Sequence, residues 1–258
     1  MVITGANGTI GSALRKYLTT QSQTIIPWDR KTFSVNNYHA AESFLRSTEP
    51  VVLFHLAIAS QPIGIENESW LINSQWPTKL AHICNKLHIK FIFTSSVMVF
   101  SDKAQGPFTI KSIPDAESGY GYEKRKAEQK VFEINPKAIV ARLGWQIGEK
   151  SGSNNMIDYL EKQMSSNGKI IASRKWLPAC SFISDTAKSL TNLLKSGPGL
   201  YMIDSNQRWN FYEICCALNK LHGNKWIVES TEDFVFDQRM IDDRMNIPLL
   251  KDTLKDLC

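Results

Sequence analysis

Three glycines at a fixed spacing are the feature that most constrains how this chain can fold. They lie in the segment Thr4–Gly11, after the apolar run Val2–Thr4 and before an amphipathic stretch. Between a strand and a helix, the first glycine permits a sharp turn and the second a close approach of backbone to a phosphate. The third lets the helix pack tightly on the sheet, and free N–H groups at the helix start face the anion. The segment therefore predicts a pyrophosphate-binding turn with contacts from Gly5, Asn7, Gly8, Thr9, Ile10 and Gly11.

Short apolar runs alternate with helical stretches through the first part of the chain. These runs are typical of strands that are buried on both faces, and they begin at Val2, Thr24, Val51, Ile89 and Ala138. Between the first two runs, Ile10, Leu14 and Leu18 share one helix face. A longer helix is predicted over 70–87. This alternation predicts an α/β fold with a doubly wound parallel sheet of the Rossmann type, which binds ligands beyond the carboxyl ends of its strands.

Charged residues follow the second predicted strand, where a ribose is recognised in folds of this kind. Asp29 lies 18 residues after Gly11 and is suited to accept hydrogen bonds from a ribose 2′-hydroxyl. Arg30 and Lys31 are suited to hold a 2′-phosphate. The residues are compatible with both NAD(H) and NADP(H), and we favour NADP(H).

After Gly144 the composition of the sequence changes, and it predicts loops rich in Gly, Ser and Asn with intermittent helices. We expect an NAD(P)-binding domain over 1–143 and a mainly substrate-binding region over 144–258, with an interleaved boundary in one compact chain. Asn155 begins a predicted helix in the second region, where its side chain is suited either to cap that helix or to contact substrate.

A Tyr and a Lys four residues apart form the candidate catalytic pair. Tyr120 and Lys124 share a helix face, and Ser96 closes a predicted strand before them. The Lys124 ammonium is expected to lower the pKa of the Tyr120 phenol, so that it can donate a proton near neutral pH, while Ser96 holds the substrate oxygen. This arrangement fits carbonyl reduction by a nicotinamide. Tyr122 and Lys126 have the same spacing, so the residues alone leave two registers open.

The order of these motifs resembles the extended short-chain dehydrogenase/reductase superfamily. In that superfamily a Gly follows the Tyr directly, and a Glu lies four residues beyond the Lys. Tyr120, Lys124 and Glu128 match this register, so the resemblance favours them over Tyr122 and Lys126. The superfamily also brings backbone near the cofactor after the third strand. By that resemblance, we add the backbone of Leu56 and Ala57 to the cofactor-binding residues.

Within the superfamily, the closest resemblance is to dTDP-4-dehydrorhamnose reductases. Residues 95–100, Ser-Ser-Val-Met-Val-Phe, are similar to that family's Ser-Thr-Asp-Tyr-Val-Phe, and 142–145, Arg-Leu-Gly-Trp, to its Arg-Thr-Ser-Trp. The resemblance implies a Rossmann core with a small, mostly helical C-terminal part. It also implies reduction of the 4-keto group of a nucleotide-diphosphate-linked 6-deoxyhexose. Tyr120 would be the proton donor, Ser96 would contact substrate, and Trp145 would line the sugar pocket.

Two departures leave alternatives to this reaction open. Val97 stands where the family has Asp, and Met98 where it has Tyr, so the sugar epimer and the nucleotide are not fixed. A nucleotide-sugar epimerase or dehydratase of the same superfamily is the first alternative. The second is a regulatory subunit that binds NADP without turnover, although the intact Ser, Tyr and Lys disfavour it.

Composition narrows the remaining function classes. The 258 residues carry a net charge of +5, but the basic residues are scattered, so we expect no nucleic-acid partner. The five cysteines show no metal-ligand or disulfide spacing, so no metal site is expected. Neither a leader nor an apolar run long enough to span a bilayer is apparent, and we expect a cytoplasmic protein without membrane contact. A homodimer is compatible with these observations.

Overall fold

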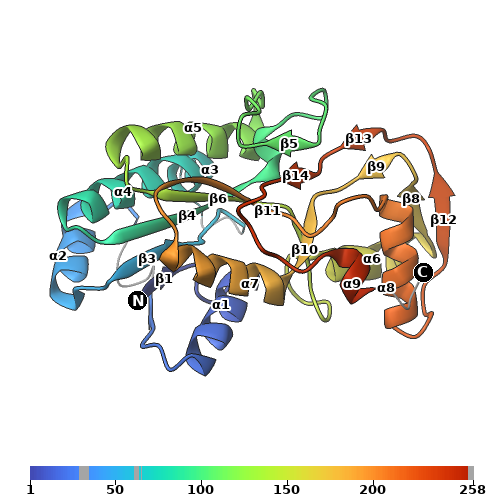
Figure 1. Cartoon of the computed structure of the whole chain (residues 1–258), viewed down its shortest axis with the longest axis horizontal. Helices are drawn as coiled ribbons and strands as arrows, with labels where there is room; N and C mark the ends of the chain where they lie inside the picture. The colour runs from blue at the N-terminus through green and yellow to red at the C-terminus, as the bar shows by residue number, and fades with distance from the viewer. Residues whose placement is uncertain (29–34, 61–63, 65, 255–258) are drawn as a thin grey trace. The chain divides into compact units, whose positions relative to one another are not determined.

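The chain forms two compact units, and each unit is built from three segments that alternate along the sequence (Figure 1). The computed structural model describes residues 1–28, 35–60, 64 and 66–254. Unit 1 comprises Met1–Ser101, Ile113–Arg142 and Leu190–Tyr201, and unit 2 comprises Asp102–Ser112, Leu143–Ser189 and Met202–Cys258. Among the described residues, no helix is long and apolar enough to cross a membrane.

A six-stranded sheet forms the centre of unit 1. Its strands are β1 (Val2–Thr4), β2 (Ile26–Pro27), β3 (Val52–His55), β4 (Lys90–Ser96), β6 (Ile139–Leu143) and β11 (Gly199–Ile203). They lie in the order β2-β1-β3-β4-β6-β11, and β1 pairs in parallel with both β2 and β3. The strand order changes direction at β1 and β3, the point at which such sheets bind ligands. The predicted doubly wound α/β fold is confirmed.

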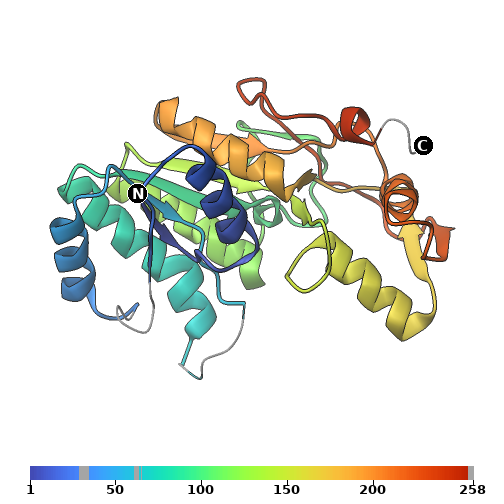
Figure 2. The ribbon, with the colours of Figure 1, turned by 90° about the horizontal axis from the view of Figure 1, so that it is seen from below.

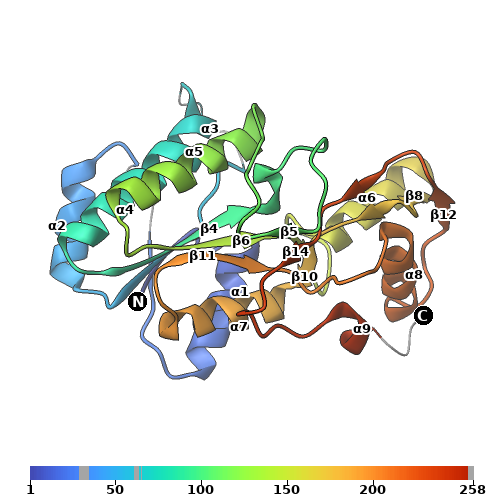
Figure 3. The ribbon, with the colours of Figure 1, turned by 45° about the horizontal axis from the view of Figure 1, so that its top comes forward.

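Helices cover both faces of this sheet. The helical elements of unit 1 are α1 (Thr9–Thr20), α2 (Tyr38–Thr48), α3 (Glu68–Trp70), η1 (Leu71–Gln75), α4 (Trp76–Lys86), η2 (Val97–Val99) and α5 (Gly119–Ile134). Helices α4 and α5 lie side by side on one face, and α1 lies on the other (Figures 1 and 3). Seen from below, α1 crosses in front of the strands (Figure 2). Most residues of β1, β3 and β6 are apolar because both faces of these strands are buried.

The helix predicted over 70–87 contains a π turn. Helix α3 continues through the π-helical turn η1 into α4 without a break. Pro77 has no N–H to donate to the carbonyl of Asn73 four residues earlier, so the regular α-helical hydrogen bond cannot form there. The wider turn rotates Asn73 into the interior, where it is only 1% exposed.

Unit 2 combines helices with short strand pairs. Its elements are β5 (Phe108–Thr109), β7 (Trp145–Ile147), α6 (Met156–Asn167), β8 (Ile170–Ser173), β9 (Trp176–Leu177), β10 (Cys180–Phe182), α8 (Phe211–Leu221), β12 (Val228–Thr231), β13 (Phe236–Asp237), β14 (Met240–Ile241) and α9 (Leu250–Thr253). Helix α7 (Ile183–Asn192) and the turn η3 (Leu193–Lys195) lead towards β11. Among the described residues of this unit, four two-stranded parallel ladders accompany the helices, which is more strand than the expected mostly helical part contains.

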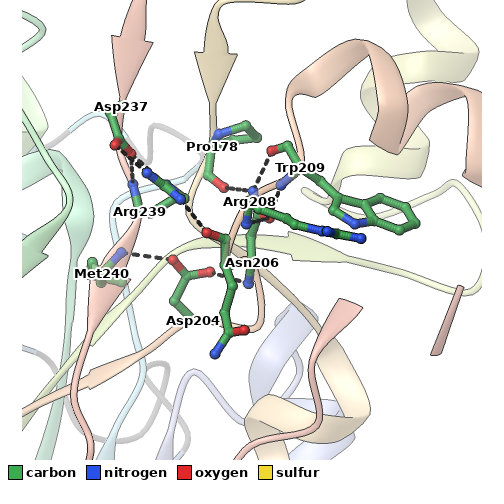
Figure 4. Close-up of polar contacts among 9 residues, drawn as sticks. Pro178, Asp204, Asn206, Arg208, Trp209, Asp237, Arg239 and Met240 are labelled. Carbon is green, nitrogen blue, oxygen red and sulfur yellow. Dashed lines mark hydrogen bonds and ion pairs between the residues drawn. The ribbon is translucent and has the colours of Figure 1, made fainter. Parts of the chain in front are cut away.

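A buried carboxylate links two strands and a loop of unit 2, and Figure 4 shows its bonds to Asn206 and Met240. Asp204 follows β11 and accepts hydrogen bonds from the backbone N–H groups of Cys180, Asn206 and Met240, at 2.8 to 2.9 Å. Burial raises the pKa of Asp204 to about 7. The amide of Asn206 then donates to the carbonyls of Pro178 and Trp209, which fixes the loop before α8.

We predict that Asp204→Ala lowers the free energy of unfolding by at least about 2 kcal/mol, because buried N–H groups lose their acceptor. Asp243→Ala removes an exposed carboxylate from the segment after β14 and is expected to change the free energy of unfolding by less than about 0.5 kcal/mol. Urea denaturation followed by circular dichroism measures both values. Equal stabilities for the two variants would contradict the central role of Asp204 in this unit.

Candidate active site

The glycine turn sits at the carboxyl end of β1 with its backbone tightly packed. Gly5 has φ +65°, and a Cβ atom on it would lie 2.8 Å from the backbone nitrogen of Ala57. A Cβ atom on Gly11 would lie 2.1 Å from the carbonyl oxygen of Gly5. The N–H of Gly8 donates to that same carbonyl at 2.9 Å and closes the turn. Gly5 and Gly11 are thus required by close backbone approach, as the motif predicts.

The start of α1 suits an anionic ligand. Gly8 is the N-cap and makes no side-chain capping bond, and the first turn carries no acidic residue. The N–H groups of Thr9, Ile10 and Gly11 are the first helical donors, which carry no intrahelical partner by position. Arg15 reaches back to Asn7, with Nη1 donating to Oδ1 at 2.7 Å, and adds positive charge beside the turn. These residues fit a pyrophosphate.

The segment after β3 lies directly against the glycine turn. Thr4 Oγ1 accepts hydrogen bonds from the N–H groups of Leu56 and Ala57, at 3.2 and 3.4 Å. It also contacts Nδ1 of His55 at 2.8 Å. His55 is fully buried, and burial lowers the pKa of its imidazole well below the usual value. The structure thus brings the predicted cofactor residues of β1 and β3 together across the point where the strand order reverses.

Ser96 ends β4 with its proton available. Its Oγ accepts the N–H of Met98 at 3.1 Å and thereby caps η2. Since the hydroxyl oxygen is used as an acceptor, its O–H is left to donate elsewhere, for example to a carbonyl oxygen. Sequence reasoning alone assigned Ser96 as a hydroxyl that holds the substrate oxygen, and this geometry is compatible with that assignment.

A second close approach sets the start of α5. A Cβ atom on Gly121 would lie 1.9 Å from the carbonyl oxygen of Met98, so only glycine lets α5 rest on η2. The preceding segment is fixed by the N–H of Ala116, which donates to the carbonyl of Val99. The helix that carries Tyr120 is therefore packed against the end of the strand that carries Ser96.

Lys124 is a fully buried amine with no hydrogen-bond acceptor among the described residues. It is 1% exposed, and its Nζ lies 4.3 Å from the ring centroid of Phe93 and 5.8 Å from that of Tyr120. Burial lowers the pKa of Lys124 to about 7, although Glu128 and Glu123 partly oppose this. Glu128 in turn forms a buried two-point ion pair with Arg142, at 2.9 and 2.7 Å. A buried donor of this kind calls for an acceptor from a ligand.

The expected effect of Lys124 on Tyr120 is not present in the free protein. Burial, followed by the charge of Glu123, raises the pKa of the Tyr120 phenol. The expectation of a lowered pKa was therefore wrong for this state. It considered only the neighbouring charge, whereas removal of the phenol from water outweighs that charge.

The alternative register has a structural explanation. Tyr122 stacks on Trp70, with ring centroids 6.0 Å apart and an interplanar angle of 27°, and Lys126 Nζ lies 5.4 Å from the Tyr122 ring. Both side chains are only partly buried. Tyr122 thus serves to pack α5 on α3, which supports Tyr120 and Lys124 as the catalytic pair.

The two predicted substrate-binding residues of unit 2, Trp145 and Asn155, have different surroundings. Trp145 is half-buried and packs against the rings of Tyr159, Trp176 and Phe211 at 5.2 to 5.9 Å. Asn155 caps α6, since its Oδ1 accepts the N–H of Asp158 at 3.2 Å. Its amide also donates within the preceding loop. Capping is therefore observed, and the substrate contact of Asn155 stays a prediction.

Some predicted residues cannot be placed, and others were missed. Asp29, Arg30 and Lys31, the basis of the cofactor preference, lie outside the described residues. Glu123 was not singled out by the sequence, yet it hydrogen-bonds to Asn73 and Ser69 of the π-turn region. Only its place inside the Tyr120–Lys124 motif could have signalled it, because its partners lie about 50 residues away.

Comparison with known sequences gives a family match. The model of the RmlD substrate binding domain family matches residues 1–222. The probable low-salt glycan biosynthesis reductase Agl14 of Haloferax volcanii is 25% identical over 179 residues, 61% of this chain and 57% of the relative. A dTDP-4-dehydrorhamnose reductase of Mycobacterium tuberculosis is 22% identical over 204 residues, covering 76% and 66%. The chain thus spans less than two thirds of the length of these two relatives.

Solved structures share the fold over nearly the whole chain. A dTDP-4-dehydrorhamnose reductase from Clostridium acetobutylicum has a TM-score of 0.83 at 21% identity, covering 99% of this chain and 97% of that one. One from Bacillus anthracis, in complex with NADP, has a TM-score of 0.82 at 19% identity with the same coverage. The Bordetella bronchiseptica enzyme WbmG, in complex with NAD and UDP, reaches 0.79 at 17% identity, covering 99% and 92%. These likenesses concern the fold.

We predict that Lys124→Met stabilises the free protein, because it replaces an unpartnered buried amine by an apolar side chain of similar length. The gain is expected to be about 1–3 kcal/mol at pH 6. It should shrink as pH rises from about 7 towards 10.5, because the unfolded chain holds the lysine proton over that range and the folded protein does not. Urea denaturation at pH 6 and pH 9 tests this, and a variant less stable than wild type at both values would contradict it.

Proposed function

Because this chain belongs to the RmlD substrate binding domain family, we propose that it is an NADPH-dependent reductase of a nucleotide-diphosphate-linked sugar. The group reduced is the 4-keto group of a 6-deoxyhexose. The observation that carries the proposal is Lys124, a buried amine without an acceptor among the described residues, beside the ring of Tyr120. The names of the relatives support the substrate class, and the Bacillus anthracis complex supports the choice of NADP(H).

The chain's own residues divide the work of holding the cofactor. The N–H groups of Thr9, Ile10 and Gly11 hold the pyrophosphate, and the backbone of Leu56 and Ala57 lines the other side of the same turn. Lys124 Nζ would donate hydrogen bonds to ribose hydroxyls of the cofactor, which would supply the acceptor that it lacks among the described residues. When bound, the nicotinamide supplies a hydride to the carbonyl carbon.

Ser96 and Tyr120 act on the oxygen of the same carbonyl. The free O–H of Ser96 donates a hydrogen bond to that oxygen and polarises the bond. Tyr120 then gives its proton to the oxygen as negative charge develops there, so that a ketone becomes an alcohol. The raised pKa of the phenol keeps it protonated before the reaction. A charged Lys124 beside it stabilises the phenolate that remains.

The alternative function, that of an epimerase, differs from that of a reductase in what happens to the hydride. An epimerase of the same superfamily would keep NAD bound and return the hydride to the substrate. The fold likeness to a UDP-glucose 4-epimerase of Thermotoga maritima, with a TM-score of 0.77, makes this the second candidate. We expect the reaction in the cytoplasm, where thiols are kept reduced, without nucleic-acid or membrane partners. A homodimer is compatible with it.

We predict that wild type oxidises NADPH rapidly when given a dTDP-4-keto-6-deoxyhexose, and that Tyr120→Phe lowers kcat by about 10²–10⁴-fold because the proton donor is lost. Loss of nicotinamide absorbance measures the rate, with NADH in parallel. Cofactor binding should survive in the variant. Full activity of Tyr120→Phe would refute the role of Tyr120, and bound NAD without net consumption would favour the epimerase.

We also predict that Trp145→Ala raises KM for the sugar nucleotide by about tenfold or more, with NADPH affinity unchanged, because an aromatic face is removed from the sugar pocket. Steady-state kinetics with each substrate varied separately tests this. Trp226→Ala, a buried tryptophan of the same unit, controls for general loss of packing. An equal effect of both variants on KM would mean that Trp145 serves only to pack unit 2.

A further inference from the structure

Glu123 holds two partners through a single carboxylate oxygen. Its Oε2 accepts a hydrogen bond from Ser69 Oγ at 2.8 Å and another from Asn73 Nδ2 at 2.8 Å. Asn73 also donates to Ser69 Oγ at 3.2 Å, which closes a three-membered network. We call Glu123, Ser69 and Asn73 the carboxylate clamp. It joins α5 to α3 and to the π turn η1.

The clamp extends to the segment after β3. Asn73 Oδ1 accepts the N–H of Ala59 at 3.0 Å, so the amide of Asn73 is occupied at both ends. Asn73 is 1% exposed, and breaking either bond would leave a buried polar group without a partner. The position of Glu123 is therefore coupled, through the two hydrogen bonds of Asn73, to the position of the backbone at Ala59.

That backbone is the segment that faces the glycine turn. Two residues before Ala59, the N–H of Ala57 donates to Thr4, and Gly5 packs against the same peptide. The clamp thus fixes the segment relative to α5, the helix that carries Tyr120 and Lys124. It sets the spacing between the proposed cofactor-binding and proton-donating groups within unit 1.

The charge of Glu123 acts on the side chains of Tyr120 and Lys124. It raises the pKa of Tyr120 and opposes the lowering of the pKa of Lys124. The other charged and titratable groups around this pair are Glu128 on α5, its partner Arg142 on β6, and His55 at the end of β3. Glu123 alone among them also bonds to the π turn.

We propose that Glu123 is a positioning residue: through Asn73, its carboxylate holds the segment Leu56–Ser60 against the catalytic helix in the geometry that binds the nicotinamide cofactor. This inference rests on the proposed function, because it assumes that this segment and Lys124 meet the same cofactor. Glu123 itself contacts neither substrate nor cofactor.

Hydrogen exchange, measured without cofactor or substrate, tests whether Glu123 holds the segment Leu56–Ser60 in place. In Glu123→Ala, a peptide that covers Leu56–Ser60 is expected to exchange at least about tenfold faster than in wild type, because Asn73 is no longer held. Glu133→Ala removes an exposed carboxylate from the same helix and should leave this peptide unchanged. If the Leu56–Ser60 peptide of Glu123→Ala exchanges at the wild-type rate, the carboxylate clamp does not hold this segment and the proposal is overturned.

Cofactor affinity and the pH profile test its consequence. NADPH binding, followed by fluorescence, should weaken by about tenfold in Glu123→Ala and change little in Glu123→Gln, which keeps an acceptor oxygen. With the sugar nucleotide, the falling alkaline limb of kcat in Glu123→Gln should move to lower pH by about half a unit or more, because removal of the negative charge lowers the pKa of both Tyr120 and Lys124, which act in their protonated forms. A purely structural residue would not shift this limb.

The outcomes separate the two proposals. If wild type binds NADPH but does not reduce the sugar, the proposed function fails, while exchange and affinity still decide the role of Glu123. If Glu123→Ala does not fold, Glu123→Gln decides through its pH profile, and a profile superimposable on wild type overturns the inference. Equal NADPH affinity of Glu123→Ala and Glu133→Ala also overturns it, as does the absence of NADPH binding by wild type.

Discussion

Close approach of backbone to backbone is the constraint on which unit 1 depends. At Gly5, Gly11 and Gly121 a Cβ atom would lie within 3 Å of main-chain atoms from another segment. The first two contacts seat α1 and the segment after β3 on the end of β1, and the third seats α5 on the end of β4. Helix starts and strand ends are thereby gathered at one edge of the sheet. No side-chain interaction could replace these contacts, since they require the absence of a side chain.

The buried lysine illustrates a conflict between stability and chemistry. Lys124 lies against the ring of Phe93, where an amine is poorly solvated, and Glu128 offsets part of that cost while being held by Arg142. An apolar residue would suit this position better in the free protein. The retention of an amine there becomes intelligible if a ligand supplies its acceptor, which connects the folding physics of α5 to the proposed reaction.

Local patterns predicted much of this molecule and failed where tertiary contacts decide. Five of the six strands of the central sheet follow from short apolar runs, and α1 follows from its periodicity, because each pattern is confined to one segment. The order of Ser96, Tyr120 and Lys124 along the chain predicts a candidate site through a family resemblance, and the catalytic roles of these residues stay a prediction. The ladders of unit 2 contain strands of two to four residues, too short to show a period. The raised pKa of Tyr120 and the bond from Glu123 to Asn73 depend on burial and on distant partners, which no local window contains.

The π turn at Leu71–Gln75 has a consequence for how this helix tolerates insertions and deletions. Each residue of an α-helix advances about 100° around its axis. A π turn holds one more residue than an α turn, so a one-residue deletion within η1 would give a regular α-helix and leave α3 in nearly its present angular phase. Trp70 and Ser69 would still face α5, whereas a one-residue deletion in the regular part of α4 would turn them away by about 100°. What the deletion within η1 would lose is the inward position of Asn73.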